Sequence, residues 1–187
     1  MPDERLSEAH QPRVRPGRFA ELGPVNWVLW RILSFGAGVP DAHLFSTLGR
    51  TRGLFRGWLH LSARLMPFGR LPRLDTELVI LRVAHVRSCE YERRHHERLG
   101  RRAGVTRELA RRVTDGPDAP GWSDRHRALL HATDALVTRR TLTDDEWAAL
   151  ADHLPPREAV EFCLLVTQYD GLATTITALR IAPDRDE

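Results

Sequence analysis

The segment Leu74–Leu99 constrains the fold more than any other part of the chain, because it reads as two consecutive helices of opposite character. Its first half is an almost continuous apolar run, LDTELVILRVAHV, with the acidic residue Glu77 set inside it. Its second half is polar and carries Cys89, Glu92 and His96. At 100° per residue, these three side chains fall within about 60° of one another on one helix face. A thiol, a carboxylate and an imidazole stacked in this way can move protons, hold a metal ion or attack an electrophile.

Helical periodicity recurs along the rest of the chain, and no stretch alternates polar and apolar residues as a strand does. Thr143, with Glu146 three residues later, has the pattern of a capping box, and Thr106 and Ser123 precede helical patterns as N-cap residues. The sequence therefore predicts an all-α fold, a compact helical bundle. The predicted helices span residues 24–35, 41–48, 51–66, 74–87, 89–102, 106–115, 123–138, 143–153 and 156–171, followed by a last helix to about residue 181.

Length and composition favour a single domain. A chain of 187 residues, of which 42% are hydrophobic, can bury a core of its own. Residues 1–18 are rich in proline, arginine and acids, so we expect a mobile N-terminal arm there and a single helical domain over 19–187. The N-terminus lacks an apolar signal segment, and no apolar run approaches the roughly 20 residues of a membrane span. We therefore expect a cytoplasmic protein with no membrane partner.

The basic residues and the cysteines exclude several types of chemistry. All 28 basic residues are arginine, so the chain offers neither a Schiff-base lysine nor the lysine of a P-loop. A formal net charge of +3 does not favour a nucleic-acid partner. Cys89 and Cys163 form no disulfide framework, and in a cytosolic protein we expect both to be reduced.

Glu77 lies on the same helical stripe as Leu81 and Ala84. A carboxylate on an apolar stripe must be paired, protonated or used in chemistry. One interpretation is a structural ion pair with an arginine, such as Arg82 or one from another helix. The other is a buried general acid or base.

Cys89 stands at the predicted start of a helix, where the helix dipole favours a thiolate, whereas Glu90 and Glu92 disfavour a second negative charge. His96 lies one to two turns further on and can pair with either group. His95 points about 100° away, so the two histidines do not form one site. These residue types also allow zinc, but the usual metal-ligand spacings are missing, and we expect neither a metal nor a cofactor.

The segment Arg93–Arg112 is rich in arginine and spans two predicted helices. A helix-turn-helix DNA reader is one interpretation of this pattern. A solvated helix face, with Glu97 and Glu108 among the arginines, is the other. The modest net charge favours the solvated face.

At these residues the chain resembles the carboxymuconolactone decarboxylase family, which includes the alkylhydroperoxidase D-like proteins. The resemblance covers about residues 40–180 and rests on ELVILRVAHV, CEYERRHH and AGVTRELARRV, with later echoes in LLHATDALV, LTDDEWAAL and LVTQYDGLATT. It implies an alkylhydroperoxidase D-like helical bundle. In the redox-active members a glutamate is followed by a cysteine, a second cysteine three residues on, and a histidine. Glu77, Cys89 and His96 match three of these positions, whereas Glu92 replaces the second cysteine.

The replaced cysteine decides the functional expectation. A CxxC pair reduces a peroxide by forming a sulfenate and resolving it as a disulfide, whereas Cys89 alone needs an external reductant unless Cys163 comes near it. The resemblance therefore favours a carboxymuconolactone decarboxylase-like enzyme that performs cofactor-free acid–base chemistry on a small organic molecule. The reaction would be a decarboxylation, an isomerisation or of lyase type. A one-cysteine, thiol-dependent peroxidase is the alternative, and a helical binding or regulatory module with an arginine-rich face is the third interpretation.

Four residues are the expected catalytic groups under this interpretation. Glu77 and His96 form an acid–base pair, Glu92 orients His96 across one helical turn, and Cys89 is a donor or a nucleophile. The expected substrate-binding residues are two aromatic side chains, Tyr91 and Trp58. The family further implies a homo-oligomer, which would be a dimer, a trimer or a hexamer.

Overall fold

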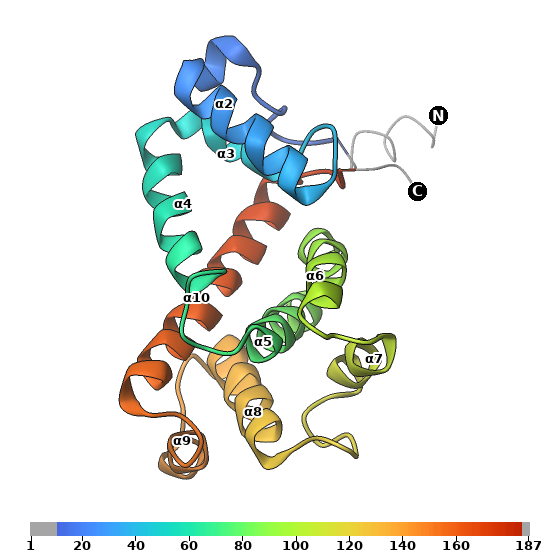
Figure 1. Ribbon diagram of the computed structural model, residues 1–187, viewed down its shortest axis with the longest axis vertical. Helices are drawn as coiled ribbons and strands as arrows, with labels where there is room; N and C mark the ends of the chain where they lie inside the picture. The colour runs from blue at the N-terminus through green and yellow to red at the C-terminus, as the bar shows by residue number, and fades with distance from the viewer. Residues whose placement is uncertain (1–10, 185–187) are drawn as a thin grey trace, which may run out of the picture. The chain divides into compact units, whose positions relative to one another are not determined.

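A computed structural model describes residues 11–184, and within this range all regular structure is helical, as predicted (Figure 1). The chain divides into two compact units. The first contains the residues up to Leu61 together with those from Thr175 onward, and the second contains Ser62–Thr174. Residues 1–10 of the predicted arm lie outside the described range. The division into a mobile arm and a single domain remains a prediction.

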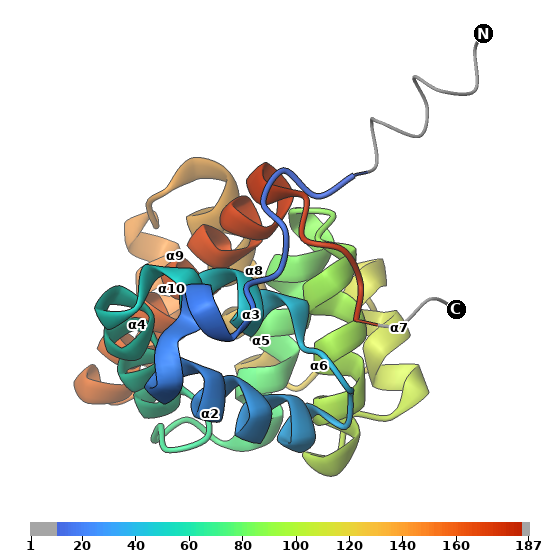
Figure 2. The same ribbon diagram turned by 90° about the horizontal axis from the view of Figure 1, so that it is seen from above.

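The first unit is built on α2 (Phe19–Ala37), α3 (His43–Leu48), the 3-10 helix η1 (Gly49–Thr51) and the start of α4 (Gly53–Leu65). Figure 2 shows α2, in blue, beside α3, and the two helices are in contact. The buried side-chain amide of Asn26 donates to the carbonyl oxygens of Gly49 and Arg52 at 2.8 and 3.1 Å, which ties α2 to η1. Helix α2 begins before the predicted residue 24, because Gly23, with φ of 72°, accommodates a kink ahead of Pro24.

The segment before α2 is held by backbone hydrogen bonds within the first unit. The amide of Arg13 donates to the carbonyl of Leu179 at 3.0 Å, and the amide of Gly17 donates to the carbonyl of Ser46 at 2.9 Å. A Cβ atom at Gly17 would lie 2.8 Å from that Ser46 oxygen, so this close approach of two backbones requires glycine.

The second unit contains the end of α4 and α5 (Arg73–Val86), α6 (Glu90–Arg102), α7 (Arg107–Asp115), α8 (Asp124–Arg139), α9 (Asp144–Ala151) and α10 (Pro156–Leu179), which continues past the end of the unit. Helix α5 is central, because it contacts α6, α7 and α8, and every residue from Asp75 to Ala84 is buried. Its side chains Leu78 and Leu81 form a core cluster with apolar neighbours, which are Val105, Val113, Trp122 and Leu130.

Three of these helices begin after N-cap residues that were predicted from the sequence. The hydroxyl oxygens of Thr106, Ser123 and Thr143 accept from backbone amides of the first turns of α7, α8 and α9 at 3.1, 3.2 and 3.2 Å. Glu146 closes the predicted capping box, because its carboxylate accepts from the amide of Thr143 at 2.9 Å. The three predicted caps are confirmed.

The prediction of two separate C-terminal helices is wrong, because α10 is continuous from Pro156 to Leu179. Gly171, the predicted end of the first of the two helices, lies inside α10. A glycine within a helix costs only about 1 kcal/mol relative to alanine. Burial of apolar side chains on both sides of Gly171, such as Tyr169 and Ala173, offsets this cost. No helix among the described residues is both long and apolar enough to cross a bilayer.

Candidate active site

The candidate site lies where α5 and α6 meet. The two helices are joined by a short turn in which Ser88 adopts a positive φ of 52° and the amide of Cys89 donates to the carbonyl of Ala84 at 2.8 Å. Cys89 is the N-cap residue of α6. The turn reverses the chain so that the polar face of α6 lies against the buried helix α5, which brings His96 to Glu77.

Glu77 is completely buried and is held by two partners. Its Oε2 lies 2.8 Å from Nδ1 of His96, and its Oε1 accepts from Nη2 of Arg73 at 2.6 Å. His96 is itself buried, whereas the Arg73 side chain is 37% exposed. The predicted partner Arg82 is wrong, because Arg82 binds both carboxylate oxygens of Asp134 at 2.7 Å.

Gly100 of α6 packs against Val105 and lies close to Glu77 of α5. A Cβ atom at Gly100 would lie 3.0 Å from Cγ2 of Val105 and 3.7 Å from Cβ of Glu77. The first of these distances is shorter than an ordinary carbon contact, so a side chain at position 100 would press on Val105, which follows α6. The second is an ordinary van der Waals contact with α5.

Tyr169 of α10 is part of the site, although the sequence did not single it out. Its buried ring meets the His96 ring edge to face, with 5.1 Å between ring centroids. Its hydroxyl donates to the sulfur of Met66 at 3.7 Å, and burial raises the pKa of this phenol. The segment LVTQYDGLATT, which echoes the family pattern, was the signal that could have found it.

Glu92 is 2% exposed, and neither of its carboxyl oxygens has a hydrogen-bond partner among the described residues. Burial, and next the negative charge of Asp170, raise the pKa of Glu92 to about 8, although the nearby Cys89 thiol acts in the opposite direction. Glu92 therefore holds its proton at neutral pH. The expectation that Glu92 orients His96 is wrong, because the imidazole is hydrogen-bonded to Glu77 instead.

Cys89 is 3% exposed, and burial together with the neighbouring Glu92 carboxylate raises the pKa of its thiol to about 12. Desolvation thus outweighs the helix dipole that the sequence suggested would favour a thiolate. Cys163 of α10 is partly buried, and burial also raises the pKa of its thiol. Neither cysteine forms a disulfide.

The two predicted substrate-binding residues, Tyr91 and Trp58, belong to different units of the structure. Tyr91 is buried on α6, where its ring stacks on His95 with 6.4 Å between centroids. Burial, and next the charges of His96 and Arg98, lower the pKa of His95 to about 3, so His95 stays neutral. Trp58 belongs to the first unit, where it stacks on Phe55 with 6.2 Å between centroids. Tyr91 and Trp58 remain proposals as substrate-binding residues.

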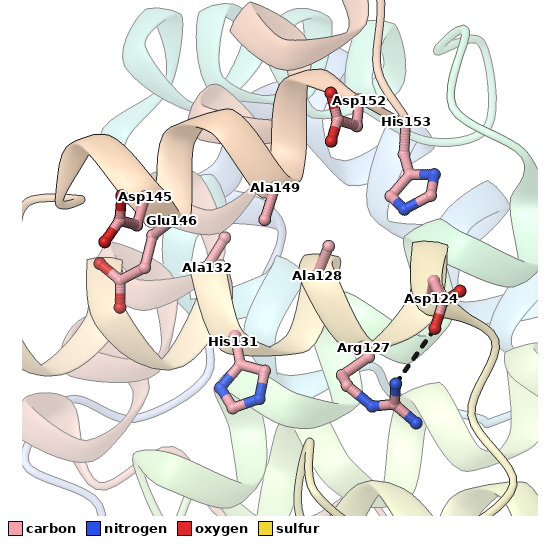
Figure 3. A pocket seen from close by; sticks show the side chains of 10 residues that line it. All are labelled: Asp124, Arg127, Ala128, His131, Ala132, Asp145, Glu146, Ala149, Asp152 and His153. Atoms are coloured by element: carbon pink, nitrogen blue, oxygen red, sulfur yellow. Dashed lines mark hydrogen bonds and ion pairs between the residues drawn. The ribbon is translucent and has the colours of Figure 1, made fainter.

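The second unit also has two surface cavities whose walls do not include Glu77, Cys89, Glu92 or His96. One, of about 360 Å³, lies between α8 and α9, where Figure 3 shows Ala128 and Ala132 facing Ala149. Its rim carries the carboxylates of Asp124, Asp145, Glu146 and Asp152. The other, of about 380 Å³, lies beside α6 and α7. Within residues 11–184, no group of three or more histidine, cysteine or acidic side chains is arranged to hold a metal ion.

The arrangement on α5 and α6 combines groups of different proton affinity in a dry environment. Glu77 and His96 share a hydrogen bond, Glu92 is an acid that keeps its proton at neutral pH, and the thiol of Cys89 is neutral. Environments that separate the pKa values of neighbouring groups in this way are typical of acid–base sites.

Comparison with known proteins supports the resemblance seen in the sequence. Residues 52–135 match the Carboxymuconolactone decarboxylase family. Comparison with curated proteins finds no match. A solved structure of an alkylhydroperoxidase AhpD core, an uncharacterized peroxidase-related protein from Ralstonia eutropha JMP134, is similar with a TM-score of 0.79 at 17% identity, over 92% of each chain.

Two further solved structures share the fold. A variant of the debrominase Bmp8 in complex with 2,3,4-tribromopyrrole aligns over 90% of each chain, with a TM-score of 0.77 at 16% identity. An uncharacterized peroxidase-related protein from Silicibacter sp. TM1040 aligns over 92% of this chain and 94% of its own, with a TM-score of 0.77 at 14% identity. At these identities the likeness shows the fold alone, and it confirms the predicted helical architecture. Residues 52–135 thus carry the resemblance to the Carboxymuconolactone decarboxylase family, and the chain shares the fold of the alkylhydroperoxidase AhpD core.

Proposed function

We propose that this protein is a carboxymuconolactone decarboxylase-like enzyme that performs cofactor-free proton transfer on a small organic molecule. The observation that carries the proposal is the buried 2.8 Å hydrogen bond between Glu77 and His96. In this proposal His96 removes a proton from a carbon next to a carbonyl group, and Glu77 stabilises the imidazolium that forms. Glu92, protonated at neutral pH, returns a proton to the product. Cys89 serves as a neutral donor beside it.

The surroundings of Arg73 support a substrate that carries a carboxylate. One guanidinium nitrogen of Arg73 binds Glu77, whereas the buried Nη1 has no hydrogen-bond partner among the described residues. A buried unpaired donor is costly, and a carboxylate of the substrate would satisfy it. The complex of the debrominase with 2,3,4-tribromopyrrole further supports a small unsaturated ring as substrate.

The thiol-dependent peroxidase remains the second candidate, because two of the similar structures are peroxidase-related proteins and Cys89 is a free thiol within the site. The raised pKa of Cys89, about 12, opposes it, since the thiolate is the species that attacks a peroxide. We therefore place proton transfer first and the peroxidase second.

Exposed apolar side chains on α2 support the proposal that the enzyme works as a homo-oligomer. Val25, Val28, Ile32 and Phe35 recur at helical spacing, and Phe35 is 88% exposed. A stripe of this kind on a helix is typical of a surface that another subunit covers. Size-exclusion chromatography with light scattering distinguishes the dimer, trimer or hexamer from a monomer. We retain the cytoplasm as the proposed location.

The proton-transfer proposal is tested with small unsaturated lactone acids in D2O. We expect the protein to incorporate deuterium at carbon or to release carbon dioxide, as followed by NMR and mass spectrometry. Glu77→Gln and His96→Gln should abolish both signals, whereas Glu90→Gln, an exposed ion-paired residue of α6, should retain them. Hydroperoxide consumption that depends on Cys89, without deuterium incorporation, would overturn the proposal in favour of the peroxidase.

A further inference from the structure

The arginine-rich segment forms a basic cavity that the proposed reaction does not use. The cavity, of about 380 Å³, lies beside α6 and α7 and is lined by Arg101, Arg107 and Arg111. Within the described residues, none of these three guanidinium groups has a carboxylate partner. Glu97 is the only acidic residue on the cavity wall, and its carboxylate is bound by Arg93.

The unpaired arginines contrast with their neighbours on the same two helices. Arg93 and Arg94 bind Glu90, and Arg112 binds Glu108 at 2.6 Å. These two helices thus neutralise several of their arginines with nearby acids. The positive charges of the three arginines that line the cavity are not neutralised by a carboxylate among the described residues. Three like charges around one cavity repel each other, and an anion between them would relieve this repulsion.

The remaining wall of the cavity suits a small molecule. Thr106 and Thr114 contribute hydroxyl groups, while Val105 and Ala110 contribute an apolar surface. Thr106 is also the N-cap residue of α7, so the positive end of that helix dipole lies at the cavity. A volume of this size falls within the range of small-ligand sites.

We propose that this cavity binds a small phosphorylated molecule. Guanidinium groups bind phosphate oxygens in pairs of parallel hydrogen bonds, and a polyanion neutralises more than one arginine at once. The concave shape of the cavity favours a compact ligand over an extended nucleic-acid backbone. The site is independent of the reaction proposed at Glu77, so each can fail without the other.

Calorimetric titration of the full chain with inorganic pyrophosphate tests this proposal. We expect saturable binding at one site that weakens as salt concentration rises. Arg107→Gln and Arg111→Gln should each weaken binding about tenfold or more, because each removes charge-assisted hydrogen bonds. Arg102→Gln is the matched control, since Arg102 is an exposed arginine at the end of α6 that does not line the cavity, and its affinity should stay within about twofold.

Three results would overturn the proposal. The first is the absence of saturable pyrophosphate binding by the folded parent protein. The second is equal weakening by the cavity variants and by Arg102→Gln, which would mean diffuse attraction to a basic surface. The third is binding of duplex DNA that is tighter than that of pyrophosphate and is lost in the same cavity variants. Melting curves without ligand establish that each variant is folded.

Discussion

Glu77 and His96 are 19 positions apart in the chain, yet their side chains meet at 2.8 Å in a place that water does not reach. Arg73 completes the arrangement from one turn before Glu77 on the same helix. Because Arg73 is partly exposed, its guanidinium can turn to water when the Glu77 carboxylate is lost. The role of Glu77 in chemistry is therefore separable from its role in stability.

We expect Glu77→Gln to lower activity by about 10²–10⁴-fold, the usual contribution of general acid–base catalysis. The protein should stay folded, with a loss of roughly 1.5–3 kcal/mol from weakened hydrogen bonds to charged groups. Turnover and thermal melting measure the two effects. Glu90→Gln serves as the control, because its exposed ion pair lies outside the site. Unchanged turnover in Glu77→Gln would assign Glu77 to structure alone.

The buried Glu92 carboxyl should make stability depend on pH. Its pKa is about 8 in the folded protein against an ordinary value of 4.5, so the folded state binds this proton more tightly than the unfolded state. The stabilisation is therefore complete below about 4.5 and is lost as pH rises through about 8. Each pH unit within this window is worth about 1.4 kcal/mol.

The comparison that isolates this effect is Glu92→Gln, which cannot titrate. We expect the melting temperature of Glu92→Gln, relative to that of the parent, to rise steadily between pH 5 and pH 8. Glu108→Gln, at a side chain that is 68% exposed, should follow the parent across the same range. Parallel melting profiles for the parent and Glu92→Gln would show that Glu92 does not retain its proton when folded.

Cys89 should be a poor nucleophile at neutral pH. With a pKa of about 12, about 10⁻⁵ of the thiol is ionised at pH 7. Turnover of cumene hydroperoxide with dithiothreitol should therefore not exceed that of Cys89→Ser. In a Cys163→Ser background, alkylation of Cys89 by iodoacetamide should keep rising with pH without a plateau below pH 10. Robust peroxidase turnover that depends on Cys89 would reverse the ranking of the two functions.

Gly100→Ala should destabilise the protein by about 1–3 kcal/mol, because the new methyl group overlaps Val105 and approaches Glu77. Gly171→Ala is the matched control, because a Cβ atom there meets nothing within 4 Å inside α10, and the change should stabilise by about 0.5–1 kcal/mol. Urea unfolding measures both changes. Equal stability of the two variants would show that the packing against Val105 does not require a glycine at position 100.

Helical periodicity was enough to predict that Cys89, Glu92 and His96 share one helix face and that Glu77 lies on an apolar stripe, because both depend on local geometry. The pairing of Glu77 with His96 came from the family resemblance. The same rule explains why Arg82 was a poor choice of partner. Five residues rotate a helix by about 140° away from Glu77, whereas the four residues back to Arg73 leave it on the same face. The N-caps of α7, α8 and α9 could likewise be predicted from the sequence, since each involves residues within one helical turn.

Contacts that depend on tertiary packing could not be predicted in this way. Tyr169 reaches His96 from α10, and although LVTQYDGLATT echoes the family pattern, helical spacing does not indicate which residue Tyr169 contacts. The sequence also did not indicate that the carboxyl group of Glu92 lacks a hydrogen-bond partner among the described residues, because the spacing alone suggested a hydrogen bond between Glu92 and His96. Whether a thiol near a helix N-terminus ionises depends on how deeply it is buried, and burial of Cys89 is a property of the packed unit.

The burial of α5 on all sides has a consequence for how the site opens. A helix with every residue from Asp75 to Ala84 buried has no solvated face, so its amide hydrogens should exchange with solvent only when the whole unit unfolds. Helix α6 is polar, and its residues other than Tyr91, Glu92, His96 and Gly100 are partly or fully exposed, which places it among the segments that open at lower cost than α5. Glu77 thus belongs to the slowest-exchanging part of the unit and His96 to a faster one. Partial opening of α6 therefore separates the acid–base pair and admits water to Glu77 while the core around α5 remains intact.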